Sequence, residues 1–299
     1  MSSTMHVLSK IVRYVKYRFS PVLIVNGYFF VNNGKLEKNN FGDDINFPLL
    51  EALTGKKVVA LSQTGLIRLP HLMCIGSIVD YCINSAAYIW GSGTTFGDSK
   101  LPVKPRKVLA VRGPLTRESL LRNGIVCPPV YGDPALLLPL VYSPHVEKKY
   151  KLGIIPHFED YDLPHVAAFR NNNSDVHFIK MRNYESWQKV IEEICSCECI
   201  ASSSLHGLIV ADAYGIPNTR VVFSDLIWGG DFKFKDYYSG VHREYFPPVS
   251  CRERIDLNII EKAIKKYNPI TFKPEELLQV FPYPLSTKFK ALARNENLD

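Results

Sequence analysis

The residues best suited to chemistry lie in positions 202–207, SSSLHG, where a predicted strand gives way to a helix. A helix N-terminus offers unpaired N–H groups and a partial positive charge to an anion, and serine hydroxyls add further donors. His206 falls in the first helical turn, where it could donate a proton to a bound substrate. A purely local role, with Ser204 capping the helix, stays open. The residues assigned to substrate contact here are Ser203, Ser204, Leu205 and Gly207.

A second strand-to-helix junction, residues 108–117, carries two arginines. Pro114 suits the first helical position because its fixed φ matches the helix and that position needs no N–H. Arg112 is expected at the strand end, pointing into a cleft, and Arg117 in the first helical turns. Two guanidinium groups beside a helix N-terminus suit a phosphate or carboxylate, although a pair of surface arginines would give the same pattern.

Paired acids begin a third helix, within residues 40–46, NFGDDIN. Asp43 is the candidate general base of this segment, or a ligand for sugar hydroxyls. Helix capping and compensation of the helix dipole explain paired acids equally well. Asn40, Gly42 and Asp44 are assigned to substrate binding beside Asp43.

Two glycine-containing turns complete the candidate site. Gly91, Ser92 and Gly93 follow a predicted strand, but they lack the full dinucleotide fingerprint and do not indicate NAD or ATP. Asp133 lies in the turn YGDP, where it either contacts substrate or holds the backbone of the turn.

The segments that position these residues alternate between strand and helix patterns. Short apolar runs are typical of buried strands, and Trp187, Val190, Ile191 and Ile194 define one apolar face of a helix. Such alternation favours parallel sheets covered by helices. The predicted strands are residues 22–25, 58–61, 88–90, 108–111, 152–155, 176–179, 198–202 and 219–223, and the predicted helices are 114–123, 184–195, 205–214 and a final helix, 257–267.

The repeated pattern predicts an α/β protein of two Rossmann-like domains that face each other across a cleft. The length of 299 residues suits two domains of ordinary size. A proline-rich stretch, residues 128–144, indicates a stiff connection between them. We place the N-terminal domain at residues 1–145 and the C-terminal domain at residues 146–299.

The composition is that of a folded protein with a moderate positive charge: 46% of residues are hydrophobic and the formal net charge is +7. This charge suits an anionic substrate, an acidic membrane surface or a nucleic acid alike. The basic residues form no K/R-rich run, so no nucleic acid partner is expected. Seven cysteines without a disulfide spacing point to the reducing cytosol. Cys195, Cys197 and Cys199 are interpreted as small apolar residues entering a strand, not as metal ligands.

The N-terminal segment combines basic and apolar residues. Lys10, Arg13, Lys16 and Arg18 alternate with apolar side chains, a pattern that can bind anionic lipid headgroups. Packing of an N-terminal helix on its own domain explains the pattern too, and is favoured. No stretch approaches the ~20 apolar residues of a membrane span. The expected location is the cytoplasm, with peripheral contact at the inner face of the membrane left open.

Five segments, taken together and in this order, resemble the polysaccharide pyruvyl transferase family. They span residues 40–217, and the combination of RGPLTRE with SLHG is specific although each piece alone is weak. The segments are NFGD (40–43), GSG (91–93), AVRGPLTRE (110–118), GDPALL (132–137) and SLHGLIVADAYGIP (204–217).

The resemblance implies a fold like that of two-domain glycosyltransferases of the B type (GT-B-like), with phosphoenolpyruvate as co-substrate and neither cofactor nor metal. It implies that His206, in the donor-side C-terminal domain, is general acid and donor ligand, and that Arg112 binds the donor. The N-terminal domain would be the acceptor side. Many members carry arginine directly before the Leu-His pair, where this chain has Ser204. Either one phosphate contact is missing in this chain, or it comes from another residue such as Arg117, Lys180 or Arg182.

The implied activity is transfer of the pyruvyl group to two hydroxyls of a sugar in a surface or capsular polysaccharide, forming a cyclic ketal and releasing phosphate. The acceptor would be the sugar or a lipid-linked oligosaccharide, and a homo-oligomer stays open. One alternative is a nucleotide-sugar glycosyltransferase on the same kind of fold, although no nucleotide pocket is recognised. The other is a catalytically silent glycan-binding subunit, which Ser204 and the aromatic residues of 228–245 would suit.

Overall fold

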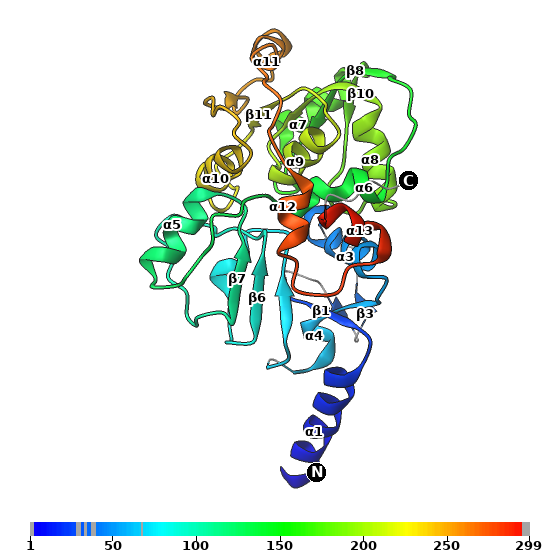
Figure 1. Ribbon diagram of the computed structural model, residues 1–299. Helices are drawn as coiled ribbons and strands as arrows, with labels where there is room; N and C mark the ends of the chain where they lie inside the picture. The colour runs from blue at the N-terminus through cyan, green and yellow to red at the C-terminus, as the bar shows by residue number, and fades with distance from the viewer. Residues whose placement is uncertain (1–2, 28–30, 33–34, 37–39, 67, 295–299) are drawn as a thin grey trace. The chain divides into compact units, whose positions relative to one another are not determined.

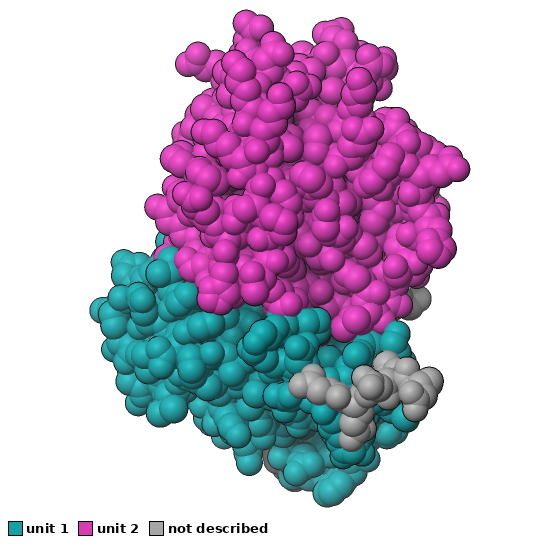
Figure 2. All heavy atoms as spheres, turned by 45° about the horizontal axis from the view of Figure 1, so that its top comes forward, with its two compact units in different colours: residues 1–37, 46–134, 273–299 teal, residues 38–45, 135–272 magenta. Residues whose placement is uncertain are grey.

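The computed structural model describes residues 3–27, 31–32, 35–36, 40–66 and 68–294 (Figure 1). The chain forms two compact units, which are coloured separately in Figure 2. Unit 1 comprises residues 1–37, 46–134 and 273–299, and unit 2 comprises residues 38–45 and 135–272. The chain therefore leaves unit 1 twice and returns to it twice.

Unit 1 is built on a five-stranded sheet with the order β4-β1-β5-β6-β7, in which all neighbouring strands run parallel. Every residue of β1 and β5 is buried, as expected for parallel strands covered on both faces. The strands are β1 Leu23–Val25, β4 Val58–Ala60, β5 His71–Met73, β6 Ala87–Trp90 and β7 Lys107–Ala110, beside a separate hairpin of β2 Val31–Asn32 and β3 Lys35–Leu36.

Unit 2 is built on a second parallel sheet with the order β12-β11-β10-β8-β9. Counted along the chain within each unit, both sheets have the strand order 2-1-3-4-5. In this order the winding reverses between the first and third strands, and open α/β sheets bind ligands outside the carboxyl ends of that pair. The strands are β8 Tyr150–Ile155, β9 Val176–Phe178, β10 Cys197–Ser202, β11 Asn218–Val222 and β12 Val249–Ser250.

The helices follow the strands and begin with ordinary capping signals. Ser186 caps α8 by accepting a hydrogen bond from the backbone N of Lys189, and the predicted face of Val190, Ile191 and Ile194 is buried. The helices of unit 1 are α1 Ser3–Phe19, α3 Asn46–Thr54, α4 Leu61–Thr64, the 3₁₀ helix η1 Val79–Tyr81, α5 Pro114–Arg122, α12 Pro274–Gln279 and α13 Thr287–Ala293. The others are α2 Phe41–Asp44, η2 Pro134–Leu137, α6 Leu138–Val141, α7 Pro164–Asn172, α8 Trp187–Cys195, α9 Leu205–Ala213, α10 Phe232–Gly240 and α11 Leu257–Ile264.

The α/β class, the two parallel sheets and a helix beginning at Leu257 are confirmed, but the prediction that this helix is the final one is wrong. The helix α11 ends at Ile264, and α12 and α13 follow it in unit 1. There the indole N–H of Trp90 donates to the carbonyl oxygen of Leu277 at 2.9 Å, and its ring lies 4.6 Å from that of Phe281. The predicted boundaries of independent domains, and a GT-B-like cleft between them, stay predictions.

The helix α1, dark blue in Figure 1, contacts unit 1 through described side chains of its C-terminal half, among them Arg13, which lies against Gly65. Tyr17 is half-buried and packs on the cluster of Ile24, Leu61 and Leu69. Most described side chains between residues 8 and 19 are exposed. None of the helices in the described ranges is long and apolar enough to cross a bilayer.

Candidate active site

The carboxyl ends of β8 and β10 bring two polar loops of unit 2 together. Ile155 and Ser202 are register partners at the ends of these strands. The hydroxyl of Ser202 donates to the carbonyl oxygen of Ile155 at 2.9 Å, and the backbone N of Ser203 donates to the same oxygen at 3.1 Å. The segment 202–207 therefore starts α9 at the point where the winding of this sheet reverses, which is its expected ligand edge.

A buried carboxylate outside the predicted set anchors this edge. Asp160 is fully buried and accepts hydrogen bonds from the hydroxyls of Ser203 at 2.6 Å and Ser224 at 2.5 Å. The hydroxyl oxygen of Ser203 also accepts a hydrogen bond from the backbone N of His157 at 2.8 Å. Ser203 and Asp160 together thus connect the loops that follow β8, β10 and β11, and so hold the site in shape.

The short helix α2 rests directly on His206 because residue 42 has no side chain. A Cβ on Gly42 would lie 1.9 Å from Nδ1 of the imidazole. The same segment is held from the other side, where the backbone N of Phe41 donates to the carbonyl oxygen of Met181 at 2.8 Å. Two of the predicted segments, residues 40–44 and 202–207, are therefore in contact within unit 2.

Asp43 is a buried acid whose proton equilibrium lies near neutral pH. Its side chain is only 8% exposed, and burial raises its pKa to about 7. The hydrogen bond from Nδ2 of Asn40, at 2.8 Å, opposes that rise and the charge of Asp44 adds to it. Asn40 makes no side-chain capping bond to α2, so its amide serves the carboxyl of Asp43. A carboxyl with such a pKa can exchange a proton at physiological pH.

Asp44 is engaged differently from its neighbour. The hydroxyl of Tyr184 donates to Oδ2 of Asp44 at 2.5 Å. Burial, followed by this bond to Asp44, raises the pKa of Tyr184 well above its usual value. The ring of Tyr184 also packs edge-on against Phe41 at 5.8 Å between centroids. Asp44 and Tyr184 therefore fix α2, and the two neighbouring acids have separate tasks.

Two cations lie close to His157 at the same edge of unit 2. Burial, and then the charges of Lys233 and Arg182, lower the pKa of His157 to about 3, so its imidazole is neutral at physiological pH. The guanidinium of Arg182 stacks at 3.9 Å from the ring centroid of Phe158 and lines a cavity of about 100 Å³. The ammonium of Lys233 donates to the carbonyl oxygen of Trp228 at 2.9 Å. With the N-terminus of α9, these side chains make this edge attractive to an anion.

Arg112, in unit 1, is fully buried, so its interpretation as a surface arginine is wrong. Its guanidinium donates to the hydroxyl of Ser77 at 2.6 Å and to the carbonyl oxygen of Thr94 at 3.0 Å. A Cβ on Gly93 would lie 2.2 Å from Cζ of this guanidinium. The GSG loop therefore packs flat against Arg112, and both lie beyond the carboxyl ends of β6 and β7.

The remaining predicted residues of unit 1 lie in the loops beyond the carboxyl ends of β6 and β7, beside Arg112. Gly91 has φ +84°, and a Cβ there would meet Pro134 at 2.3 Å, so only glycine fits the turn. The hydroxyl of Ser92 donates to the carbonyl oxygen of Gly76 at 2.7 Å. Asp133 is fully buried beside this turn. The structure brings Gly91, Ser92, Gly93, Arg112 and Asp133 to one corner of unit 1.

Three further predicted residues differ in their surroundings: Arg117 lies apart from His206, Lys180 lines the same cavity as Arg182, and Ser204 belongs to the segment 202–207 itself. The Nε of Arg117 donates to the carbonyl oxygen of Cys127 at 3.0 Å and so braces the loop after α5. The ammonium of Lys180 lies 5.4 Å from the ring centroid of Tyr161. Ser204 precedes α9 without a side-chain capping bond. Of the three cations considered as replacements for the arginine missing at Ser204, Arg182 is therefore the one placed beside His157.

The cysteines at positions 195, 197 and 199 lie where the sequence placed them, at the entry to a strand. Cys195 ends α8, and Cys197 and Cys199 belong to β10. All seven cysteines are free thiols. Across the described residues no group of three histidine, cysteine or acidic side chains is arranged to hold a metal ion.

Comparison with known proteins gives these groups a context. The family model for polysaccharide pyruvyl transferase matches residues 4–222, most of the chain and nearly all the residues discussed above. The chain belongs to the polysaccharide pyruvyl transferase family.

Two proteins similar in sequence to this chain come from a bacterium and a virus. The chain is 29% identical over 230 residues to the succinoglycan biosynthesis protein ExoV of Rhizobium meliloti (strain 1021), covering 72% of this chain and 67% of the relative. It is also 29% identical over 215 residues to the uncharacterized protein L143 of Acanthamoeba polyphaga mimivirus, covering 69% of this chain and 73% of the relative.

Proposed function

We propose that the protein transfers the pyruvyl group of phosphoenolpyruvate to two hydroxyls of a sugar in a polysaccharide or its lipid-linked precursor. The observation that carries this proposal is the contact of α2 with His206 beside an acid, Asp43, whose pKa is about 7. Two groups able to exchange protons near neutral pH thus lie on touching segments at the ligand edge of unit 2. Ketal formation needs such a pair, because one proton must reach carbon while another leaves a hydroxyl.

The reaction assigns a task to each side chain. His206 protonates the methylene carbon of phosphoenolpyruvate, which leaves an oxocarbenium-like centre at the neighbouring carbon. A sugar hydroxyl attacks that centre and gives its proton to Asp43. Phosphate then departs, and a second hydroxyl closes the ring while its proton passes to the departing phosphate. The net change is two new C–O bonds to sugar oxygens, one new C–H bond and one new O–H bond on phosphate, against two broken O–H bonds of the sugar, the lost C=C π bond and one broken C–O bond to phosphate.

The donor carries a phosphate and a carboxylate, which need positive partners. In unit 2, Arg182, Lys233 and the N-terminus of α9 supply them, with Arg182 replacing the arginine missing at Ser204. In unit 1, Arg112 is the donor-binding candidate implied by family membership. Its buried guanidinium, held by Ser77 and Thr94, has a fixed orientation that suits a preorganised ligand.

The donor assignment is tested by the thermal midpoint of unfolding with saturating phosphoenolpyruvate and, separately, with nucleotide sugars. A ligand at ~100 times its dissociation constant adds about 2.7 kcal/mol, which raises the midpoint by several degrees. Phosphoenolpyruvate should give that shift, and Arg182→Ala should reduce it because an anion partner is lost.

The matched control is Lys189→Ala, an exposed cation on α8 paired only with Glu192 among its described contacts, which should leave the shift unchanged. A midpoint that rises with one nucleotide sugar and not with phosphoenolpyruvate would instead identify a glycosyltransferase.

We also propose that α1 rests on an anionic membrane surface, where a lipid-linked acceptor would be found. Leu8, Val12 and Phe19 are 63%, 60% and 80% exposed, and Ile11 and Val15 continue the same stripe. The alternative, in which this stripe packs on its own domain, does not fit that exposure. The helix carries Lys10, Arg13, Lys16 and Arg18 and no acid, so pairing with a second copy of itself would be repulsive.

A further inference from the structure

We propose that unit 2 carries a second binding site, for a saccharide with a single carboxylate, in a cavity of about 560 Å³ between the start of β11 and α11. Pockets for small ligands commonly have volumes of about 300–1,000 Å³. The cavity is lined by the first residues of β11, by residues 243–250, and by one side of α11. The choice of ligand rests on the proposed function, because a pyruvate ketal adds one carboxylate to a sugar.

The cavity is separate from the candidate active site. Residues 218–220, which line it, begin β11, whereas Ser224 follows the end of this strand and bonds to Asp160. A strand rises about 3.3 Å per residue, so the two ends of β11 are roughly 15 Å apart. A ligand in this cavity would therefore leave His206 and its neighbours free.

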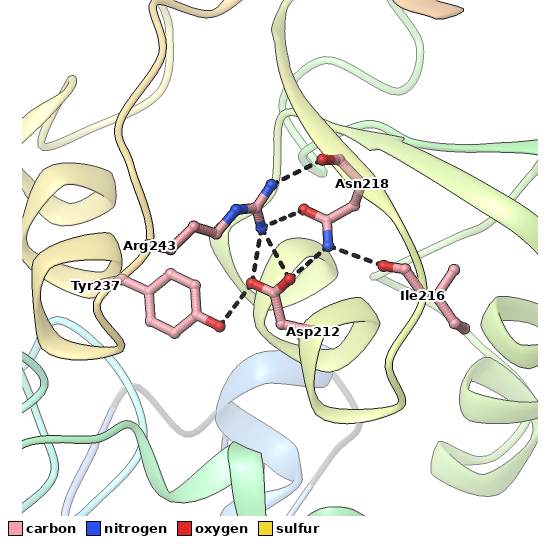
Figure 3. Close-up of polar contacts among 5 residues, drawn as sticks. All are labelled: Asp212, Ile216, Asn218, Tyr237 and Arg243. Atoms are coloured by element: carbon pink, nitrogen blue, oxygen red, sulfur yellow. Dashed lines mark hydrogen bonds and ion pairs between the residues drawn. The ribbon is translucent and has the colours of Figure 1, made fainter. Parts of the chain in front are cut away.

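The floor of the cavity is a buried ion-pair network, drawn in Figure 3. One guanidinium nitrogen of Arg243 donates to both carboxylate oxygens of Asp212, at 2.8 and 2.9 Å, and the other donates to the carbonyl oxygen of Asn218 at 2.7 Å. The hydroxyl of Tyr237 donates to Asp212 at 2.8 Å. Buried ion pairs give little net stability but do fix geometry, so this one holds the chain at the base of the loop 244–250.

Three of the side chains that line the cavity are aromatic, those of Tyr238, Phe246 and Tyr267. The guanidinium carbon of Arg243 lies 4.7 Å from the ring centroid of Tyr238 and 4.6 Å from that of Tyr267, which sets both rings in place. Phe246 is partly exposed at the mouth. Flat apolar rings cover the C–H faces of a sugar, while its hydroxyls remain available to polar groups.

Arg220 forms part of the side of the cavity made by β11. It is 7% exposed, pairs with Asp231 at 2.7 Å and stacks 3.7 Å from the ring centroid of Phe234. Because its guanidinium is both paired and stacked, this side of the cavity has a fixed shape.

The charge at the mouth matches one carboxylate. Arg220 and Arg243 are already neutralised by their acid partners. The other charged lining residues are Lys262 on α11, Lys266 just after that helix, and Glu244, and all three are exposed. Together they leave a surplus of one positive charge. Glu244 can accept a sugar hydroxyl but would repel a multiply charged diphosphate, which argues against a nucleotide.

The test is a ligand-observed NMR titration of the full-length protein with a methyl glucoside carrying a 4,6-linked pyruvate ketal. The unmodified methyl glucoside, which carries no charge, is the control ligand. We expect the ketal to bind at least ten times more tightly than the neutral glycoside. The double variant Lys262→Ser/Lys266→Ser should remove that preference, while Lys265→Ser, an exposed lysine of the same helix end that does not line the cavity, should keep it.

Two further measurements separate this site from the active site. The ketal should bind His206→Ala as it binds the unaltered protein, and saturating phosphoenolpyruvate should not displace it. Equal binding of the neutral glycoside, an equal loss in Lys265→Ser, or displacement by phosphoenolpyruvate would each overturn the second site. A thermal shift with phosphoenolpyruvate but no ketal binding would leave the proposed function standing alone. Ketal binding without any response to phosphoenolpyruvate would leave the cavity site standing and count against the transfer reaction.

Discussion

The imidazole of His206 is the residue on which the proposed chemistry depends most directly. We expect His206→Ala to lower the rate of phosphate release from phosphoenolpyruvate, in the presence of acceptor, by 10²–10⁴-fold, because that is the usual contribution of a general acid. The variant should keep the thermal midpoint of the unaltered protein to within a few degrees. Retention of more than about a tenth of the rate in a folded variant would exclude the acid role.

The raised pKa of Asp43 should also make the free energy of unfolding depend on pH. Its pKa is about 7 in the folded protein and 3.8 when unperturbed, so the folded state holds its proton over a pH range where the unfolded state has lost it. Stability is therefore greatest below about pH 4 with respect to this group, and falls as the pH rises to about 7. The full effect is about 4 kcal/mol at most, and Asp43→Asn should not show it.

The measurement is urea unfolding of Asp43→Asn and of the unaltered protein at pH 5 and pH 8. The variant should gain stability relative to the unaltered protein between these two values. Asp225→Asn, at an acid that is 82% exposed, is the control and should show no such gain. If the difference between the Asp43 variant and the unaltered protein is the same at both pH values, the carboxyl is ionised throughout and is no proton carrier near neutrality.

Sequence patterns located some of these residues and could not have located others. His206, Arg112 and Asp43 stand at strand-to-helix junctions, a position that periodicity alone identifies. Asp160 lies at no such junction, and Arg182 was named only as one of three cations that could replace the missing arginine. They join the site through contacts between loops that follow different strands, and only the pairing of those strands brings the loops together.

The helix α1 exposes a stripe of apolar side chains between basic ones, which we propose to contact lipid. We expect the protein to pellet with vesicles containing phosphatidylglycerol and not with neutral phosphatidylcholine vesicles. The triple variant Leu8→Ser/Val12→Ser/Val15→Ser should lose pelleting because the inserted apolar stripe is gone. Lys10→Gln/Lys16→Gln should weaken it by about 2 kcal/mol, since each cation near an anionic surface contributes about 1 kcal/mol.

Control substitutions for α1 are available elsewhere on unit 1. Val126 is 87% exposed and Ile83 is half exposed, so Val126→Ser/Ile83→Ser removes apolar surface without touching the helix. This variant should pellet normally. Pelleting that survives the triple variant, or that fails equally in the control, would remove α1 from contact with lipid.

Helices and strands with a regular spacing of apolar residues were predicted from the sequence. Those stabilised mainly by contacts with residues far away in the chain were not. The helix α8 and strands β8 to β11 were predicted to within about three residues, because their apolar periods are regular. The strand β5 was missed, since its three residues include the polar His71. The helices α12 and α13 were missed too, being short and stabilised largely by burial of Leu277, Leu278 and Phe289.

At the scale of the whole molecule, residues 273–294 return to unit 1, and their contribution to its stability can be measured. Phe281 is largely buried and packs against Trp90, so Phe281→Ala should lower the free energy of unfolding by about 3–5 kcal/mol. Urea unfolding followed by tryptophan fluorescence would report it. Phe96→Ala, at a ring that is 38% exposed in the same unit, should cost much less. Similar losses in both variants would show that the returning segment adds little.

The route of the chain through the two units also sets an order for their formation during synthesis. Unit 2 has all of its described residues once residue 272 has emerged from the ribosome, whereas unit 1, which begins earlier in the chain, also needs residues 273–294. Multidomain proteins usually fold their N-terminal domain first. Here the nascent chain carries a partly covered sheet, with Trp90 lacking its contacts to Leu277 and Phe281, until residues 273–294 have emerged. Unit 1 is therefore completed after unit 2, although its sheet strands are synthesised first.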